Sequence, residues 1–368
     1  MKIGILTFHR AINYGAFLQA FALKKYLSSL GNDVEIIDYW PNGHADVYRL
    51  FPRSWKNLSF VRKIKSIFSL MLVYSRAKKR RNGMLRLVED YLGLTAIPCY
   101  QTPESLSDIS YDCVVYGSDQ IWWKSTILGY MGFDPVYWGE YLPNGVRKIA
   151  YAPSMGIIEL TAQDKDWIRR RLANFDVLSV RESALVHVLS PLIEQNISLV
   201  LDPVFLLSSE EWEKFCIPIN QSRYILYYNL ILSKEADELV ETMVKKLQCD
   251  VVEITGSVRP IKFGKRYVQT ADAVEFVSLV KNATFVITSS FHGTAFALLF
   301  KKQFYSIGMG KRAGRVESLL EQLNIGNRLV KKVEEMSLDE IDYDIVQKRM
   351  QLLALQSQKY LIDAVRIS

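Results

Sequence analysis

The stretch Phe285-Val286-Ile287-Thr288-Ser289-Ser290-Phe291-His292-Gly293-Thr294 joins a short apolar run to a polar turn and a second apolar run. Residues 285–287 have the composition of a buried strand, and residues 294–300 that of a buried helix. A strand followed at once by a helix is the repeating unit of a parallel sheet covered by helices. His292 is therefore predicted at the carboxyl edge of a sheet, where open α/β sheets bind ligands.

The residues around His292 suit an anionic ligand. Ser289, Ser290 and Thr294 supply hydroxyl donors, and the first amides of the following helix can bind an anion. Gly293 would let the backbone approach a ligand closely. The alternative is a core histidine with a satisfied hydrogen bond, but small polar neighbours on both sides favour a ligand site.

Strand-like runs alternate with helical patterns along all 368 residues. This length exceeds what one hydrophobic core normally supports, and the pattern begins afresh after Asp202-Pro203. We therefore predict an α/β protein with two Rossmann-like domains facing across a cleft. The first would span residues 1–205, the second 206–345, and a terminal helix at 346–368 would pack back on the first.

The predicted elements are assigned from periodicity and apolar runs. Strands are expected at 2–7, 34–38, 113–116, 148–150, 177–180, 199–201, 224–228, 251–254, 285–287 and 304–307. Helices are expected at 17–30, 234–247, 273–281, 294–300, 316–323 and 344–365.

Composition excludes several classes of protein. An apolar content of 49% excludes wholesale disorder. Met1 leads directly into a strand with no leader sequence, so a cytoplasmic protein is expected. The cysteines lie far apart without ligand spacing, which predicts neither a disulfide framework nor a metal site; they are Cys99, Cys113, Cys216 and Cys249.

The net charge of +7 is concentrated in one segment. Between Arg53 and Arg86 there are eleven Lys or Arg residues and no Asp or Glu, within a predicted helical excursion at about 53–94. No nucleic-acid-binding signature accompanies it. The apolar run at 67–74 is too short to span a bilayer, which needs roughly 20 residues. A basic amphipathic helix on an anionic membrane or on an anionic substrate is one interpretation, and an ordinary solvated helix pair is the other.

Cationic residues follow strands in both predicted domains. Arg181 comes directly after the strand at 177–180 and opens a helix, where it could hold a phosphate or carboxylate. The alternative is an ordinary surface ion pair. The second domain also has cationic residues after a strand, among glycines; they are Lys311, Arg312 and Arg315. The alternative for this segment is a flexible, solvated loop. Together they predict an electropositive site for a multiply charged anion.

The string Gly117-Ser118-Asp119-Gln120-Ile121-Trp122-Trp123 allows two interpretations. A carboxylate beside exposed indoles would hold a sugar by stacking and hydrogen bonds. Alternatively, Ser118 or Asp119 caps a helix and the tryptophans pack in the core. Asp202, which precedes Pro203, is interpreted as a turn and hinge residue.

Motifs that the chain lacks narrow the chemistry. It contains no GxxxxGK[ST] loop, no HExxH helix and no nucleophile elbow, and residues 8–16 lack a GxGxxG fingerprint. Kinase, zinc hydrolase, serine hydrolase and NAD dehydrogenase functions therefore lose support. Transfer of a group from an anionic donor to a polar acceptor remains.

Five strings, in order over roughly residues 1–325, resemble the polysaccharide pyruvyl transferase family. They are Asn13-Tyr14-Gly15-Ala16 with Leu18-Gln19, Gly117-Ser118-Asp119-Gln120-Ile121-Trp122, Ser179-Val180-Arg181-Glu182, Leu201-Asp202-Pro203 and Ser290-Phe291-His292-Gly293-Thr294. The resemblance implies a GT-B-like pair of Rossmann-like domains. It also implies that phosphoenolpyruvate donates its pyruvate as a ketal to two hydroxyls of a sugar in a bacterial surface polysaccharide or its precursor.

The resemblance implies that His292 and Arg181 act in donor binding and catalysis. Together with the loop chemistry, it leads us to predict donor binding by Ser290, Gly293, Thr294, Arg312 and Arg315. Acceptor binding is predicted for Asn13, Tyr14, Gly15, Gln19, Ser118, Asp119 and Trp122. The acceptor would be a sugar or a lipid-linked oligosaccharide, and the scheme needs no metal or cofactor beyond phosphoenolpyruvate as donor substrate.

Two positions depart from the family's pattern. Ala271-Asp272-Ala273 stands where Gly-Pro usually opens a helix, and Trp123 stands where Asn is common and could alter acceptor choice. Two other functions stay open. One is a GT-B glycosyltransferase whose His292 turn binds the pyrophosphate of a nucleotide sugar. The other is a catalytically silent scaffold of a polysaccharide assembly complex, tethered through residues 53–86.

Overall fold

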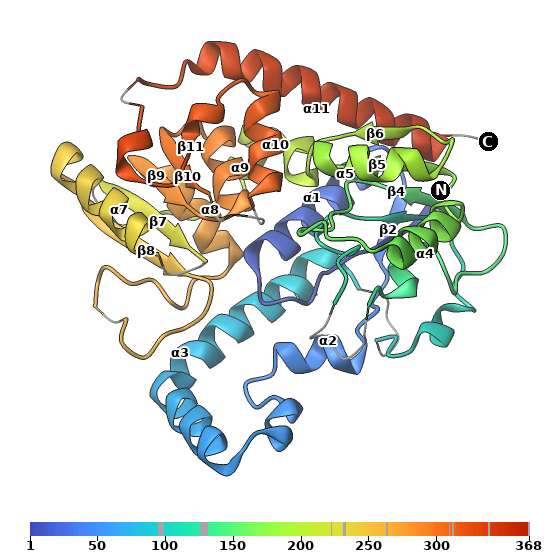
Figure 1. Ribbon diagram of the computed structural model, residues 1–368, viewed down its shortest axis with the longest axis horizontal. Helices are drawn as coiled ribbons and strands as arrows, with labels where there is room; N and C mark the ends of the chain where they lie inside the picture. The colour runs from blue at the N-terminus through green and yellow to red at the C-terminus, as the bar shows by residue number, and fades with distance from the viewer. Residues whose placement is uncertain are drawn as a thin grey trace. The chain divides into compact units, whose positions relative to one another are not determined.

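The chain forms two compact units (Figure 1). The computed structural model describes residues 1–94, 99–125, 132–221, 223–230, 233–262, 264–308, 310, 313–337 and 339–366. The first unit comprises Met1–Arg49, Leu87–Leu207 and Met350–Ser368, and the second comprises Leu50–Arg86 and Ser208–Arg349.

The first unit is built on a six-stranded sheet in the order β2-β1-β3-β4-β5-β6, with every pair parallel. Its strands are β1 (Lys2–Leu6), β2 (Asp33–Ile36), β3 (Cys113–Tyr116), β4 (Arg147–Ala150), β5 (Val177–Val180) and β6 (Ile197–Leu199). Its helices include α1 (Tyr14–Ser29), α2 (Asn42–Val47), α4 (Ala162–Leu172) and α5 (Ser183–Leu189). Every residue of β3 is buried, as expected for a central parallel strand.

The second unit is built on a five-stranded parallel sheet in the order β11-β10-β9-β7-β8. Its strands are β7 (Tyr224–Asn229), β8 (Asp250–Thr255), β9 (Phe285–Thr288), β10 (Phe304–Ile307) and β11 (Leu329–Val330). Its helices include α6 (Ser209–Glu213), α7 (Lys234–Leu247), α8 (Ala273–Asn282), α9 (Phe291–Leu299) and α10 (Gly314–Gln322). Two parallel sheets with helical connections confirm the predicted α/β class with two Rossmann-like domains.

Most strands begin and end within a residue or so of their predicted bounds. The strand expected at 199–201 is β6 at Ile197–Leu199. The chain leaves the sheet there because the Leu201 amide donates to the Ser357 hydroxyl at 2.9 Å. The two-residue strand β11 was not predicted, since two residues carry no periodicity.

The basic segment belongs to a different unit from the one expected. The sequence suggested an excursion of the first domain, but residues 50–86 group with the second unit. The guanidinium of Arg80 donates to the Thr255 carbonyl oxygen at 2.8 Å, and that of Arg76 donates to the Lys262 carbonyl oxygen at 3.0 Å. These side chains attach α3 (Phe60–Leu92) to the end of β8 and the following loop.

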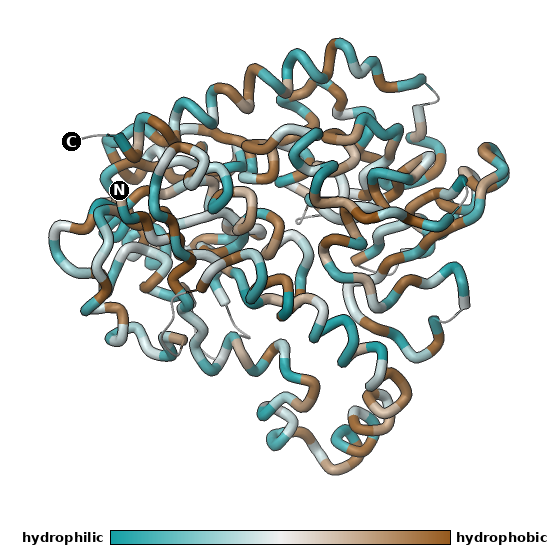
Figure 2. The backbone as a smooth tube through the Cα atoms, turned by 180° about the vertical axis from the view of Figure 1, so that it is seen from behind, coloured by the Kyte–Doolittle hydropathy of each residue, from teal (hydrophilic) through white to brown (hydrophobic). Residues whose placement is uncertain are grey.

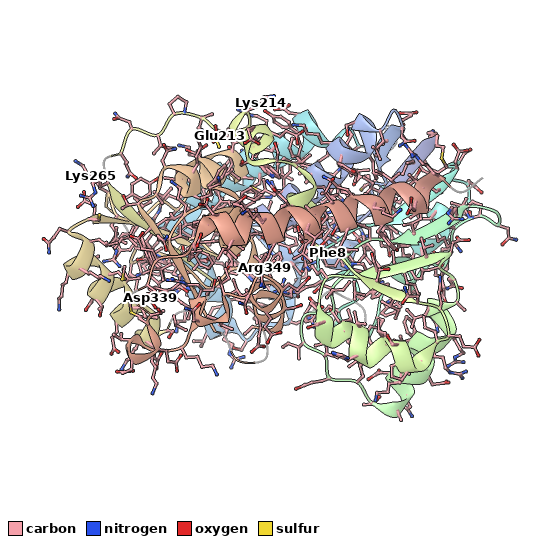
Figure 3. All side chains as sticks on the ribbon, turned by 90° about the horizontal axis from the view of Figure 1, so that it is seen from above. Phe8, Glu213, Lys214, Lys265, Asp339 and Arg349 are labelled. Atoms are coloured by element: carbon pink, nitrogen blue, oxygen red, sulfur yellow. The ribbon has the colours of Figure 1, made fainter. Side chains whose placement is uncertain are left out.

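The terminal helix α11 (Tyr343–Arg366) contacts the first unit from Met350 onward. The Tyr360 hydroxyl donates to the Ala150 carbonyl oxygen at 3.0 Å, and the Gln358 amide donates to the Leu206 carbonyl oxygen at 3.1 Å. Arg349, labelled in Figure 3, is the last residue of the second unit.

Each unit has its own apolar core. That of the first contains Tyr137, Trp138 and Phe175, and that of the second contains Leu239 and Ile287. Figure 2 shows hydrophobic and hydrophilic residues alternating along the backbone of both units. Among the described residues, no helix combines the length and the apolar character needed to cross a membrane.

Candidate functional site

The turn between β9 and α9 is fixed by side-chain hydroxyls. The Thr288 hydroxyl donates to the Tyr228 carbonyl oxygen and accepts from the Ser290 amide, both at 3.0 Å. Ser290 caps α9, since its hydroxyl accepts from the Gly293 amide at 3.4 Å. This cap starts the helix at Phe291, three residues before the predicted start, because the sequence pattern marked only the apolar run.

His292 therefore lies in the first turn of α9 rather than in the preceding loop. It is 7% exposed, and its ring meets that of Phe291 edge-on at 5.2 Å between centroids. The first amides of a helix carry a partial positive charge. The imidazole thus lies where a small anion is electrostatically favoured.

Gly293 and Thr294 hold the turn in place. A Cβ on Gly293 would lie 2.3 Å from the Thr288 hydroxyl oxygen, so glycine is needed for the contact between helix and strand. Close approach of a ligand to the Gly293 backbone stays a prediction. Thr294 is buried, and its hydroxyl bonds to the Ser306 hydroxyl at 2.6 Å, which ties α9 to β10.

Of the predicted donor residues Arg312 and Arg315, the structure describes Arg315. Arg315 is half-buried in the first turn of α10. Arg312, like Lys311, lies outside the described residues.

A pocket opens beside this turn, within the second unit. Its volume is about 580 Å³, and it is lined by Ser233, Glu235, Ala236, Ser289, Ile307, Gly308, Lys331, Lys332 and Glu335. Ser289 belongs to the same turn as His292, and Ile307 ends β10. The pocket therefore lies at the carboxyl edge of the sheet, with two lysines in its wall.

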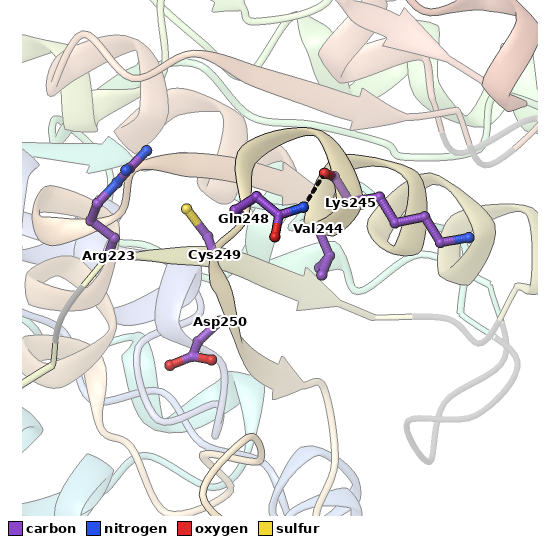
Figure 4. Close-up of a pocket in the computed structure, with 6 residues that line it drawn as sticks. All are labelled: Arg223, Val244, Lys245, Gln248, Cys249 and Asp250. Carbon is purple, nitrogen blue, oxygen red and sulfur yellow. Dashed lines mark hydrogen bonds between the residues drawn. The ribbon is translucent and has the colours of Figure 1, made fainter.

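A second pocket, drawn in Figure 4, lies at the opposite edge of the same sheet. Arg223 precedes β7 and Asp250 opens β8, so this pocket is at the amino ends of the strands. The Gln248 amide donates to the Lys245 carbonyl oxygen at 2.6 Å across its wall. It is far along the strands from the His292 turn and is not the candidate site.

In the first unit, Arg181 is held in a buried ion pair. Its guanidinium pairs with Asp202, and both side chains are almost wholly buried. The Ser118 hydroxyl accepts from Arg181 at 2.8 Å and donates to Asp202 at 2.9 Å. Asp202 also accepts from the Val204 amide at 3.1 Å, so it fixes Arg181 in addition to shaping the turn that the sequence suggested.

A second carboxylate adjoins this ion pair. Glu182 is buried 4.0 Å from Arg181 Nε and accepts from the Ser154 hydroxyl. Carboxylates on two sides fix the direction of the guanidinium and balance its charge. A donor that binds Arg181 must compete with Asp202.

The predicted contact of Trp122 with an acceptor is wrong, because the side chain is in the core. It has no exposed surface, stacks on Trp138 with 4.5 Å between ring centroids, and donates from its indole nitrogen to the Tyr137 carbonyl oxygen at 2.9 Å. The packing alternative is correct for this residue. The expected helix cap is not, since a turn rather than a helix follows Asp119.

Asp119 has a left-handed backbone with φ of 74°. Its carboxylate accepts from the Gln120 amide at 2.8 Å, and the side chain keeps a small exposed surface. A non-glycine residue in this conformation is uncommon and points to a constrained loop.

The predicted residues at the start of α1 shape the β1–α1 loop. Asn13 caps the helix by accepting from the Gly15 amide at 3.0 Å. Gln19 is buried and donates to the Thr7 hydroxyl, the Phe8 carbonyl oxygen and the Ala16 carbonyl oxygen at 3.0, 3.2 and 2.8 Å. Tyr14 and Gly15 are also buried. Of the four, Asn13 is the one with an exposed side chain.

The sequence analysis did not single out a charged cluster at the ends of β1 and β2. The Asp38 carboxylate contacts His9 Nε2 at 2.9 Å and accepts from Arg10 Nε at 2.6 Å. Burial raises the pKa of Asp38, but hydrogen bonds from Arg10 and His9 outweigh it and lower the pKa to about 2. The available signal was that polar residues directly follow two neighbouring strands.

Aromatic side chains lie beside this cluster. Trp40 and Tyr48 stack with 5.8 Å between centroids, and both are half-buried. Burial and the nearby Asp119 carboxylate raise the pKa of Tyr48 to about 12. Trp40 and Tyr48 are thus a stacked pair of partly buried rings, and Tyr48 lies close enough to the Asp119 carboxylate to be affected by its charge.

Two further titratable groups are buried, namely His44, which packs on Phe8, and Asp134; Phe8 is labelled in Figure 3. His44 packs edge-on against Phe8 at 5.4 Å and is 4.0 Å from Asp134. Burial lowers the pKa of His44 to about 4. Burial also raises the pKa of Asp134 to about 6, against the hydrogen bonds from the Val136 amide and Tyr39. Both groups are thereby favoured in their neutral forms near pH 5.

The family model for polysaccharide pyruvyl transferase matches residues 13–310, which is most of the chain and includes the turns of both Arg181 and His292. The chain belongs to the polysaccharide pyruvyl transferase family. No curated protein matches it.

This family member also has similar solved structures. UDP-GlcNAc 2-epimerase from Neisseria meningitidis, bound to UDP-GlcNAc, is 12% identical, with 99% of each chain covered and a TM-score of 0.47. UDP-GlcNAc 2-epimerase from Methanocaldococcus jannaschii is 12% identical over 96% of this chain and 93% of its own, with a TM-score of 0.45. The E. coli heptosyltransferase WaaC with ADP is 11% identical over 96% and 100%, with a TM-score of 0.40.

For a polysaccharide pyruvyl transferase family member, the described residues supply two kinds of chemistry. The second unit offers a helix start, hydroxyls and an imidazole, which suit an anion and a proton transfer. The first unit offers fixed charges and half-exposed rings, which suit a polyhydroxylated ligand. Among the described residues, no group of three or more His, Cys, Asp or Glu side chains is arranged to hold a metal ion.

Proposed function

We propose that this protein transfers the pyruvyl group of phosphoenolpyruvate to two hydroxyls of one sugar, forming a ketal. The observation that carries the proposal is the family match over residues 13–310, together with an imidazole in the first turn of α9. The acceptor would be a sugar of a bacterial surface polysaccharide, free or as a lipid-linked precursor.

His292 would deliver the proton that starts the reaction. Protonation of the methylene carbon of phosphoenolpyruvate breaks the carbon–carbon double bond and leaves an oxygen-stabilised cation at the neighbouring carbon. Imidazole is suited to proton transfer near neutral pH. The partial positive charge at the start of α9 would meanwhile hold the donor's phosphate or carboxylate.

The remaining steps balance without another reactant. One sugar hydroxyl attacks the cationic carbon and loses its proton, and the bond from that carbon to the phosphate oxygen breaks. The second hydroxyl then closes the ring and loses its proton. The products are one ketal and one inorganic phosphate, which leaves with the electron pair of the broken carbon–oxygen bond.

Within the second unit, donor contacts would come from Ser290 and Arg315. The donor roles of Arg312 and of Arg181 in the first unit stay predictions from the family resemblance. Because Asp202 already pairs with Arg181, the guanidinium would be presented to the donor in one orientation. It would steady the charge that develops on the leaving phosphate.

Acceptor contacts would come from the first unit. The half-exposed rings of Trp40 and Tyr48 would stack on the apolar face of the sugar, and Asp119 and Asn13 would bind its hydroxyls. These rings take the place of the Trp122 indole, which is buried in the core.

The test has a binding part and a turnover part. We expect phosphoenolpyruvate to raise the temperature of thermal unfolding and a nucleoside diphosphate to leave it unchanged. With a correct sugar acceptor, phosphate should be released from phosphoenolpyruvate only when both substrates are present. Protection by the nucleoside diphosphate alone would favour the nucleotide-sugar glycosyltransferase. Protection by neither, with no phosphate release, would favour a silent scaffold.

A further inference from the structure

The N-terminal half of α3 exposes an apolar stripe. Phe60 is 77% exposed, Phe68 62% and Met71 71%, and Ile64 between them is also exposed. Positions 60, 64, 68 and 71 are three or four residues apart, so their side chains lie along one side of the helix. In Figure 2 this part of the tube is marked by hydrophobic colour.

From Leu70 onward, the opposite side of the same helix is packed against protein. Leu70, Val73 and Met84 are buried, and Arg76 and Arg80 donate to carbonyl oxygens of the second unit. The helix is therefore held in place by its residues from Leu70 onward, and most of the stripe lies on the part that precedes them. The exposed stripe is a second apolar face, and a solvated surface helix would carry polar residues there.

Positive charge surrounds the stripe. Between Arg53 and Arg86 the chain carries no Asp or Glu. Exposed basic side chains lie before, within and after the stripe; they are Arg53, Lys56, Arg62, Lys65, Lys78 and Lys79. An apolar stripe between cationic side chains is complementary to lipid tails beneath anionic headgroups.

We propose that the α3 stripe, defined as Phe60, Ile64, Phe68 and Met71 with its flanking basic residues, docks the protein on an anionic lipid surface. A second copy of the chain fits this face less well, because pairing two stripes would bring like charges together. A nucleic acid would pair with the charges but leave the apolar side chains in water. The inference is independent of the reaction that the protein catalyses.

Docking is tested with the full chain and sedimented vesicles. We expect binding to vesicles of phosphatidylcholine mixed with phosphatidylglycerol, at least roughly tenfold weaker binding to phosphatidylcholine alone, and weakening by added salt. The variant Phe68→Glu/Met71→Glu removes the apolar contact, and Arg62→Glu/Lys65→Glu reverses the local charge. Each should lower binding roughly tenfold or more.

The matched control is Leu352→Glu/Leu355→Glu on α11, where both leucines are similarly exposed, at 58% and 62%. It should bind vesicles as the wild type does. All variants should keep the wild-type thermal unfolding and its response to phosphoenolpyruvate, which separates a docking failure from a failure of the proposed reaction. Equal binding to neutral and anionic vesicles, or unchanged binding by both α3 variants, would overturn the inference. So would a dimer in solution that Phe68→Glu/Met71→Glu converts to monomer.

Discussion

The carboxyl edges of the two sheets are built from different chemistry. In the first unit this edge holds the buried ion pair of Arg181 with Asp202 and the partly buried ion pair of Arg10 with Asp38. In the second unit the turn after β9 is built from hydroxyls and backbone amides around His292. Similar topology therefore supports a network of paired charges in one unit and a hydroxyl-lined helix start in the other.

The contrast separates residues needed for folding from residues available to a ligand. A buried charge whose partner is removed costs much of the stability of a domain. A helix start keeps its amides whether or not an anion is bound. Substitution of Arg181 should therefore lower stability whether or not it also affects activity, whereas substitution of His292 should act largely on activity.

The largest effect on folding is expected for Arg181→Ala. It leaves Asp202 buried without its cationic partner and should lower the free energy of unfolding by about 3–5 kcal/mol. Chemical denaturation measures this, with Arg181→Lys as the control that keeps a positive charge. A loss below about 1 kcal/mol would show that Asp202 is stabilised in some other way.

The next effect concerns pH and the pair His44 and Asp134. Below its ordinary pKa of 6.5, His44 binds protons in the unfolded chain but not in the folded one until about pH 4, so stability falls as pH falls. Asp134 binds a proton in the folded protein from about pH 6, but in the unfolded chain only near 3.8, so stability rises as pH falls. Each group changes the free energy of unfolding by about 3 kcal/mol across its pH range. Because the two changes have opposite signs, they largely cancel in the wild type.

Asp134→Asn should expose the slope of His44, because asparagine still accepts from the Val136 amide. Denaturation at a series of pH values should show this variant losing stability from pH 6.5 to 4 relative to wild type. His44→Gln should gain stability over the same range. Profiles parallel to that of the wild type would contradict the assigned shifts.

A smaller effect is expected for Gly293→Ala in the second unit. The added methyl would meet the Thr288 side chain, so we expect a loss of about 1–3 kcal/mol from overpacking. The double variant Gly293→Ala/Thr288→Ala removes the hydroxyl oxygen nearest to the new methyl, so its loss in the same assay should be smaller than the sum of the losses of the two single variants. Wild-type stability of the single variant would contradict the packing role assigned to this glycine.

The smallest effect is expected for Ser290→Ala, which removes the cap of α9. Loss of one N-cap hydrogen bond should cost about 1 kcal/mol. Thermal unfolding monitored by circular dichroism detects it, and Ser290→Asp should restore stability by supplying another capping oxygen. If the aspartate variant is no more stable than the alanine variant, the hydroxyl does not act as a cap.

Local sequence predicted the order of strands and helices because apolar periodicity is itself local. The strands at 113–116, 177–180 and 304–307 and the helix at 234–247 have the predicted bounds. Helix starts were placed less well: α1 begins at Tyr14 because Asn13 caps it, three residues before the apolar run. Polar capping residues do not belong to the apolar period, so the apolar pattern alone places the start of such a helix too late.

The site was harder to predict, because its contacts join residues far apart in the chain. Nothing near Asp202 in sequence indicates that Ser118, 84 residues earlier, donates to it. Burial is equally non-local: Trp122 looked exposed beside polar neighbours, yet its indole packs on Trp138. The placement of His292 after β9 could be predicted, since it depends only on one strand and the turn that follows.

The most direct test of the account is the rate of phosphate release from phosphoenolpyruvate, with acceptor present, by wild type and His292→Ala. We predict a decrease of about 10²–10⁴-fold if the imidazole delivers the proton. The free energy of unfolding should change by less than about 2 kcal/mol, in contrast with Arg181→Ala. An unchanged rate for a folded His292→Ala variant would contradict the account.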